Sequence, residues 1–148
     1  MEKSQFNSLI EKGFNHIPLS REVLVDTDTP LALYLKLANN PYSYFLESVQ
    51  GGEKWGRYSF VGLAAETVIK VNDYDVSIEK NGKLHKQYKV EDPLAWIEDY
   101  QSKFKVPQLE ELPDFNGGLV GYFGYEIIKF IEPKLKNIKK KDELNVPD

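Results

Sequence analysis

The sequence contains no cysteine and only two histidines. Without cysteine, disulfides, thiolate nucleophiles and zinc–thiolate sites are excluded, and the composition suits a reducing compartment, so we expect a cytoplasmic protein. The histidines, His16 and His85, are accompanied neither by a G-x-S-x-G turn nor by an H-x-x-x-H pair. The residues therefore indicate neither a serine–histidine active site nor a metal site in this chain.

Long apolar runs and an excess of positive charge are lacking as well. No stretch approaches the roughly 18 apolar residues that a membrane span needs, and residues 1–10 contain no apolar core of a secretory signal. The formal net charge is −4, which provides no general attraction for nucleic acid or for an anionic membrane. We therefore expect neither nucleic acid nor a membrane as a partner.

The residues that are present are typical of one globular domain. The chain has 148 residues, of which 41% are hydrophobic and 13% aromatic. A domain of this length buries about two thirds of the surface that its unfolded chain exposes, and we expect most of the aromatic rings in its core.

Apolar spacing and turn residues predict an alternation of helices and strands. Helices are expected over residues 6–10, 30–38 and 93–104, and strands over residues 42–49, 57–63, 66–71, 75–80 and 83–90. Asp28 or Thr29 can cap the second helix and Asp92 the third, each directly or closely before a proline. Asn81 and Gly82 favour a two-residue type I′ turn between the last two strands, which are polar enough to expose a face to water. Antiparallel strands without βαβ alternation predict an α+β fold, a largely antiparallel sheet or sandwich with a few packed helices.

The glycine-rich stretch GGLVGYFG, residues 117–124, alternates small and apolar residues. Its spacing is not that of a phosphate-binding glycine loop. It predicts a strand whose glycines let it pass close to another backbone or a large ligand.

Residues 44–63, YFLESVQGGEKWGRYSFVGL, place polar groups inside two strand-like runs. Strand alternation puts Glu47 and Ser48 on opposite faces, and Arg57 and Ser59 on the same face. One interpretation is an edge hairpin that exposes these groups to solvent and pairs Glu47 with Arg57. The other is a site for an amino acid, in which the acid or a hydroxyl takes the ammonium and the guanidinium takes the carboxylate beside an aromatic wall. The spacing alone leaves both open.

Two motifs of the chain resemble those of the N-terminal domain of anthranilate synthase component I. Residues 45–63, FLESVQGGEKWGRYSFVGL, resemble the family pattern L-L-E-S…R-Y-S-[FI]-[IV]-G. Residues 115–126, FNGGLVGYFGYE, resemble P-F-x-G-G-x-[VL]-G-[YF]-x-[GS]-Y-[DE]. The motifs follow in the family's order and spacing, so the resemblance covers nearly the whole chain and implies one N-terminal regulatory domain over residues 1–148.

The resemblance implies that this domain carries a feedback site for L-tryptophan. The implied binding residues are Leu46, Glu47, Ser48, Arg57, Tyr58 and Ser59, with Gly117 and Gly118 expected near the pocket. Phe45 stands where the family pattern has a leucine. Ser48 is the implied partner of the amino-acid head group, Glu47 of its ammonium and Arg57 of its carboxylate. Either Ser48 alone faces the ligand, or a bulge turns Glu47 and Ser48 inward together.

The resemblance also implies an enzyme, a carbon–oxygen lyase that converts chorismate and ammonia or glutamine to anthranilate in the first step of tryptophan biosynthesis. In the family, chorismate and Mg²⁺ bind a larger C-terminal catalytic domain that this sequence lacks, so we expect no cofactor in this domain and no activity from this chain alone. The implied protein partners are that C-terminal domain and a glutamine amidotransferase subunit, component II. Tyr122, Phe123 and Tyr125 are expected to be exposed contacts between domains.

Two other functions remain open. The N-terminal domain of aminodeoxychorismate synthase component I, of the folate pathway, has similar motifs. A free-standing small-molecule-binding or scaffold domain without catalysis is the third interpretation.

Overall fold

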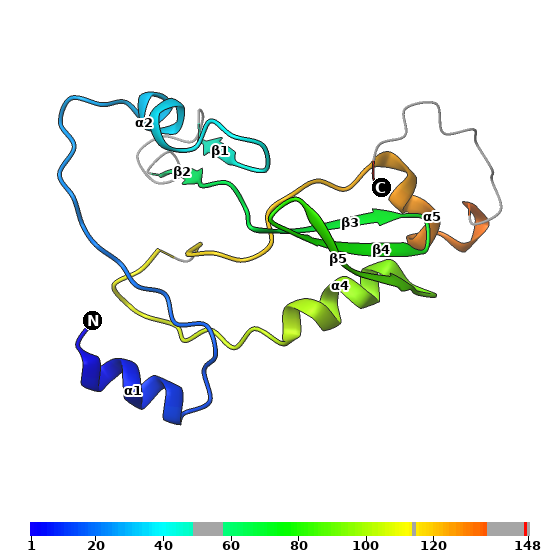
Figure 1. Cartoon of the computed structure of the whole chain (residues 1–148), viewed down its shortest axis with the longest axis horizontal. Helices are drawn as coiled ribbons and strands as arrows, with labels where there is room; N and C mark the ends of the chain where they lie inside the picture. Colours follow the sequence, from blue (N-terminus) through cyan, green and yellow to red (C-terminus); the bar gives the residue numbers. More distant parts are fainter. Residues whose placement is uncertain (49–57, 114, 136–146, 148) are drawn as a thin grey trace. The chain divides into compact units, whose positions relative to one another are not determined.

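The computed structural model of the chain describes residues 1–48, 58–113, 115–135 and 147 (Figure 1). The chain forms two compact units. Unit 1 comprises residues 1–22, 71–76 and 88–148, and unit 2 comprises residues 23–70 and 77–87. That residues 1–148 act as a single domain stays a prediction.

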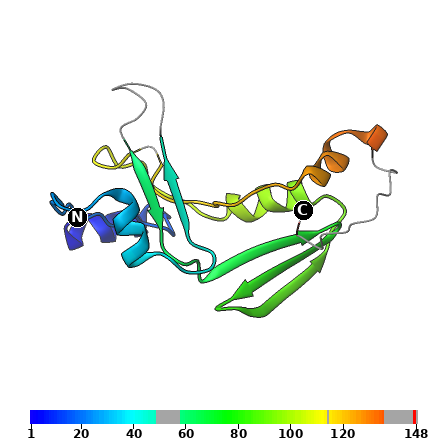
Figure 2. The same cartoon turned by 90° about the horizontal axis from the view of Figure 1, so that it is seen from above.

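Unit 2 contains the helix α2 (Pro30–Leu37) and the antiparallel strands β1 (Tyr44–Glu47) and β2 (Ser59–Gly62). The backbone N–H of Ala32 donates to Thr29 Oγ1 at 3.2 Å. Thr29 is therefore the cap of this helix, and a proline occupies the first turn as the sequence predicts. Figure 2 shows α2 beside the β1–β2 pair.

A three-stranded antiparallel sheet is formed by β3 (Thr67–Asn72), β4 (Asp75–Lys80) and β5 (Lys83–Lys89), in that order. Asn81 and Gly82 connect β4 to β5 with φ angles of 50° and 72°. A type I′ turn needs positive φ at both central residues, so the predicted turn is confirmed. Every residue of β5 is exposed, which confirms that this hairpin presents a face to water.

Unit 1 contains most of the helices. They are α1 (Lys3–Glu11), α4 (Pro93–Ser102), α5 (Ile128–Ile131) and the 3₁₀ turns η1 (Tyr125–Ile127) and η2 (Pro133–Leu135). In the part of the chain that the structure describes, no helix is long and apolar enough to cross a membrane. With its two small antiparallel sheets, the chain has the predicted α+β fold.

Asn15 ties the segment after α1 to the segment after α4. Its Nδ2 donates to the carbonyl of Lys103 at 2.7 Å, and its Oδ1 accepts from the backbone N–H of Lys105 at 2.7 Å. These two bonds satisfy both ends of the side-chain amide, so they hold the two segments in a defined alignment.

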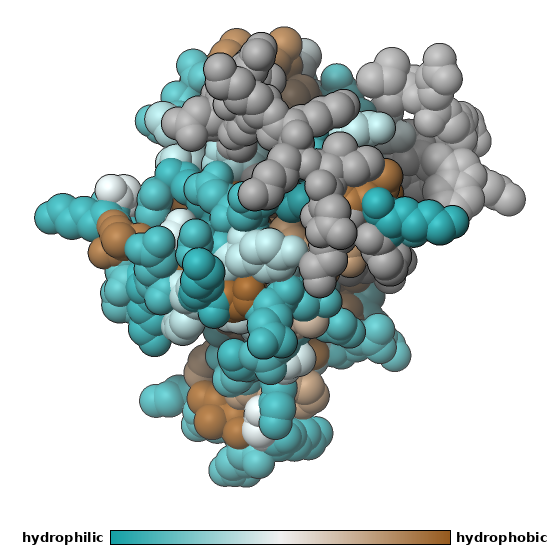
Figure 3. Space-filling model, turned by 90° about the vertical axis from the view of Figure 1, so that its right-hand side faces the viewer, coloured by the Kyte–Doolittle hydropathy of each residue, from teal (hydrophilic) through white to brown (hydrophobic). Residues whose placement is uncertain are grey.

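Few of the described residues are buried, and the buried aliphatic side chains are small. They are Val71 and Val76 in unit 1 and Ala38 and Ile78 in unit 2. Among the described residues no aromatic side chain is fully buried, so the expectation that most rings lie in the core is wrong. The rings instead pair with one another near the surface, and Figure 3 shows apolar side chains in brown reaching the face in view.

The three aromatic residues expected to be exposed are exposed. The exposed fractions of Tyr122, Phe123 and Tyr125 are 62%, 63% and 84%. Their role as contacts between domains stays a prediction.

Residues 117–124 do not form the predicted strand. Gly117 and Gly118 have φ angles of 139° and 138°, in a region that L side chains rarely adopt. A Cβ atom added at either glycine, or at Gly121, would meet no atom within 4 Å. The first two glycines therefore permit an unusual backbone conformation. Among the described residues, no other backbone comes close to these three positions, and the expected approach to a large ligand stays a prediction.

Lys70 on β3 and Glu79 on β4 form a half-buried ion pair. Lys70 Nζ lies 2.7 Å from Glu79 Oε1, and the side chains are 28% and 22% exposed. The Lys70 ammonium also lies 5.5 Å from the ring centroid of Tyr42, the residue that leads into β1. The contacts with Glu79, and secondly with Tyr42, raise the pKa of Lys70 above its ordinary value of 10.5.

Asp92→Ala is expected to lower the free energy of unfolding by about 1 kcal/mol. Asp92 Oδ1 accepts from the backbone N–H groups of Leu94 and Ala95, at 2.9 Å and 3.1 Å, and alanine leaves both donors at the start of α4 without this partner. Urea denaturation followed by circular dichroism measures the change. Glu91→Ala, at the preceding exposed position, is the matched control, and equal midpoints for the two variants would contradict the capping role.

Glu79→Gln is expected to lower the pKa of Lys70, because a neutral amide no longer stabilises the ammonium. The folded-state pKa of Lys70 lies above that of the unfolded chain, so the stability linked to this group is present below pH 10.5 and is lost as the pH rises through the folded-state pKa. An NMR titration of the Lys70 Cε resonance measures the shift. Glu66→Gln, an exposed acid beside β3, is the control; a Lys70 pKa that Glu79→Gln leaves unchanged would count against the ion pair.

Candidate functional site

The segments that carry the predicted site residues pair with each other in a regular register. Across the pair, Glu47 lies opposite Ser59 and Leu46 lies opposite Phe60. The pairing is continuous from Tyr44 through Glu47 without a bulge. Glu47 and Leu46 therefore lie on opposite faces of the hairpin, since successive residues of a strand alternate.

The helix α2 covers one face of this hairpin. The rings of Tyr34, on α2, and Phe45, on β1, stack with their centroids 5.7 Å apart. Phe45 shares its face with Glu47 and, across the pair, with Ser59. The acid and the hydroxyl that the sequence singles out therefore lie on the helix-covered face.

A hollow of about 500 Å³ lies between α2 and β2. It is lined by Pro30, Leu33, Leu37, Tyr58, Ser59, Val61 and Leu63. The lining is mainly aliphatic, with the Ser59 hydroxyl and the Tyr58 side chain as its polar groups. A wall of this kind suits the apolar body of a small molecule that has a polar group at one end.

The opposite face of the hairpin carries Leu46 and, across the pair, Phe60. Leu46 is 47% exposed, and the ring of Phe60 lies 6.1 Å from the ring of Tyr58 between centroids. Ser48 follows the last paired residue of β1 and is exposed. Leu46 thus contributes accessible apolar surface to this second face.

The structure places five of the six residues that were expected to bind tryptophan in or beside one hairpin. Three of them, Leu46, Glu47 and Ser59, belong to the β1–β2 pair, whereas Ser48 directly follows β1 and Tyr58 directly precedes β2. Arg57, the sixth, lies outside the described residues, and so does its predicted pairing with Glu47.

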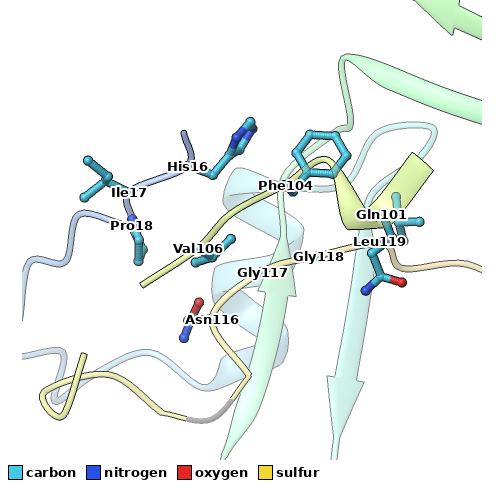
Figure 4. A pocket seen from close by; sticks show the side chains of 10 residues that line it. All are labelled: His16, Ile17, Pro18, Gln101, Phe104, Val106, Asn116, Gly117, Gly118 and Leu119. Carbon is cyan, nitrogen blue, oxygen red and sulfur yellow. The ribbon is translucent and has the colours of Figure 1, made fainter. Parts of the chain in front are cut away.

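Gly117 and Gly118 belong to unit 1 and line a different hollow, of about 440 Å³ (Figure 4). Its other lining residues are His16, Ile17, Pro18, Gln101, Phe104, Val106, Asn116 and Leu119. The rings of His16 and Phe104 meet edge to face at 4.7 Å between centroids. The two glycines therefore have neighbours that the sequence did not predict for them, and whether they approach the hairpin stays a prediction.

Sequence reasoning did not include α2 in the site. Leu33 and Leu37 line the hollow beside β2, and Tyr34 stacks on Phe45. The signal was present, because these residues recur at the three- and four-residue spacing of one helical face. That spacing does not say which strand the face will meet.

The described residues contain no group of three or more histidine, aspartate or glutamate side chains that could hold a metal ion.

No protein-family model matches the chain, and no solved structure matches it. Several curated proteins do. Anthranilate synthase component 1 of Pseudomonas putida is 51% identical over 148 residues, which is all of this chain and 30% of the relative. The protein of the same name from Neisseria meningitidis serogroup B is 48% identical over 151 aligned residues, which cover 100% of this chain and 30% of the relative. The protein of the same name from Aquifex aeolicus is 42% identical over 125 residues, which cover 84% of this chain and 25% of the relative.

The chain thus spans about 30% of the length of the first two of these relatives, and the match lies in their N-terminal part. All three share the component 1 name, and nothing in the comparison supports aminodeoxychorismate synthase. With identities of 42% to 51% over most or all of its residues, the chain belongs to the anthranilate synthase component 1 family and corresponds to its N-terminal part.

Proposed function

We propose that this chain is the regulatory part of an anthranilate synthase component 1 and that it binds L-tryptophan as a feedback inhibitor. The observation that carries the proposal is the 51% identity to the Pseudomonas putida protein across the whole chain. The hairpin adds a physical argument, because it joins an acid, several hydroxyls and an apolar hollow within unit 2.

The groups around the hairpin are complementary to an amino acid with a large apolar side chain. In this proposal the indole occupies the hollow between α2 and β2, against Leu33 and Leu37. The carboxylate of Glu47, opposite Ser59 on the same face, accepts from the ligand's ammonium. Charge-assisted hydrogen bonds of this kind are among the stronger ones available to a site.

Two serines are candidates for the remaining contact with the head group. Ser59 lines the hollow, whereas Ser48 follows Glu47 at the exposed end of β1. Ser48 lies beyond the last residue of β1, where strand alternation no longer fixes the direction of a side chain, and we propose it as the main contact, with Arg57 supporting the carboxylate. The competing arrangement, with Ser59 in this role, has the advantage of lying on the same face as Glu47.

The chemistry proposed for the complete enzyme takes place outside these residues. A component 1 polypeptide would convert chorismate and ammonia to anthranilate in the cytoplasm, with chorismate and Mg²⁺ held by the part of the relatives beyond the matched region. The name component 1 implies a further component, which we propose to be a glutamine amidotransferase that supplies ammonia. Tryptophan would act by favouring a conformation that is poor at this chemistry, with a coupling of about 1–3 kcal/mol.

Calorimetric titration of this chain with L-tryptophan is expected to show binding at one site. We expect a lower affinity than in a complete component 1 polypeptide, because part of the pocket wall would come from the rest of that polypeptide. D-Tryptophan and L-phenylalanine are the control ligands, since they alter the head-group geometry and the side chain separately. Equal heats for all three, or none for L-tryptophan, would contradict the regulatory function.

Ser48→Ala is expected to weaken L-tryptophan binding by about tenfold or more, the loss typical of a hydrogen bond to a charged group. In a complete component 1 polypeptide, the same change should weaken inhibition and leave the uninhibited turnover of chorismate largely intact. Ser59→Ala tests the competing arrangement, and Ser20→Ala, at an exposed position of unit 1, is the matched control. A loss with Ser59→Ala alone would transfer the role to Ser59.

A further inference from the structure

Gly62 differs from five other glycines of the chain in what surrounds it. A Cβ atom added there would overlap the ring atoms Cδ1, Cε1 and Cζ of Tyr44. At Gly13, Gly82 and Gly121, as at the two glycines after Asn116, such an atom would meet nothing within 4 Å. The ring of Tyr44 thus occupies the space that a side chain at position 62 would take.

This contact is a cross-strand one. Tyr44 is the first residue of β1 and Gly62 the last of β2, and the two lie directly opposite each other. Glycine weakens a strand because it has no side chain to pack, and an aromatic ring laid across it restores the lost contact. Gly62 is not among the residues with positive φ, so its backbone conformation does not require glycine, but the ring does.

The contact distinguishes the observed register from its neighbours. β1 and β2 have four residues each, and so short a two-stranded pair is weakly specified by its backbone bonds. A slip by one residue would place Tyr44 opposite Val61 or Leu63. Their branched side chains would occupy the space in which the ring now lies.

The same register sets the geometry at the other end of the pair. It places Glu47 opposite Ser59 on the face beside α2. A slip by one residue would put Glu47 opposite Tyr58 or Phe60. It would also turn the side chains of one strand to the opposite face of the pair. The acid and the hydroxyl would then no longer lie side by side.

We infer that Tyr44 and Gly62 are positioning residues of the tryptophan site: the ring over the glycine fixes the hairpin register that places Glu47 beside Ser59. The inference rests on the proposed function for its ligand, and on the ring, the glycine and the pairing for its mechanism. Neither residue needs to touch the ligand.

Gly62→Ala and Tyr44→Leu test this inference from both sides. We expect each to weaken L-tryptophan binding by about tenfold, measured by NMR titration and corrected to the folded fraction. The double variant Tyr44→Leu/Gly62→Ala should bind more tightly than Gly62→Ala, because without the ring the added methyl group has room. Gly121→Ala, at a position where the Cβ meets nothing and φ is not positive, is the matched control.

The pairing itself is the second readout. Nuclear Overhauser effects between the backbone protons of Glu47 and Ser59 should be present in the unmodified chain and weaker in both single variants. A purely structural role would lower the melting temperature and leave the affinity of the folded fraction unchanged, and that result would overturn the inference. If Gly62→Ala does not fold, Tyr44→Leu decides, and unmodified affinity in that variant overturns it as well.

The two proposals fail in different ways. If the unmodified chain does not bind L-tryptophan, the proposed function fails, and the Glu47–Ser59 effects still report whether Tyr44 and Gly62 fix the register. If the unmodified chain binds and the variants bind equally well, the positioning role fails and the proposed function stands.

Discussion

The antiparallel pairing of β1 with β2 is the interaction on which the candidate site depends. It connects two segments that are separated along the chain by a stretch that the structure does not describe, and it brings Glu47 opposite Ser59. Neither residue forms a site alone, because a carboxylate and a hydroxyl on separate strands contribute to one ligand only when the strands are in register. The stack of Tyr34 on Phe45 adds α2 to this pair and supplies the apolar wall.

The site combines features with different physical demands. An aliphatic hollow favours an apolar ligand through the removal of its surface from water, while a carboxylate near that hollow favours an ammonium. Unit 2 meets both demands by giving the two faces of the hairpin different surroundings. One face meets α2, and the other carries the half-exposed Leu46.

Local features of the fold could be predicted because they depend on neighbouring residues. The type I′ turn at Asn81 and Gly82 needs only residues that accept positive φ. Asp92 caps α4 because its own side chain reaches the free backbone N–H groups two and three residues later. A prediction that failed, a strand over residues 117–124, depends on residues far apart in the sequence. These residues have an apolar, strand-like composition, yet a strand forms only where a partner strand offers backbone hydrogen bonds.

The sequence by itself determined the family, because two long motifs in order identify it, and determined which residue types are available to a ligand. Only the tertiary structure decided that Glu47 shares a face with Ser59, that α2 lines the hollow, and that the ring of Tyr44 fills the place of a side chain at Gly62. The physical reason is the period of a strand. Alternation states which residues share a face within one strand, but the register between two strands is set by side-chain packing across the pair.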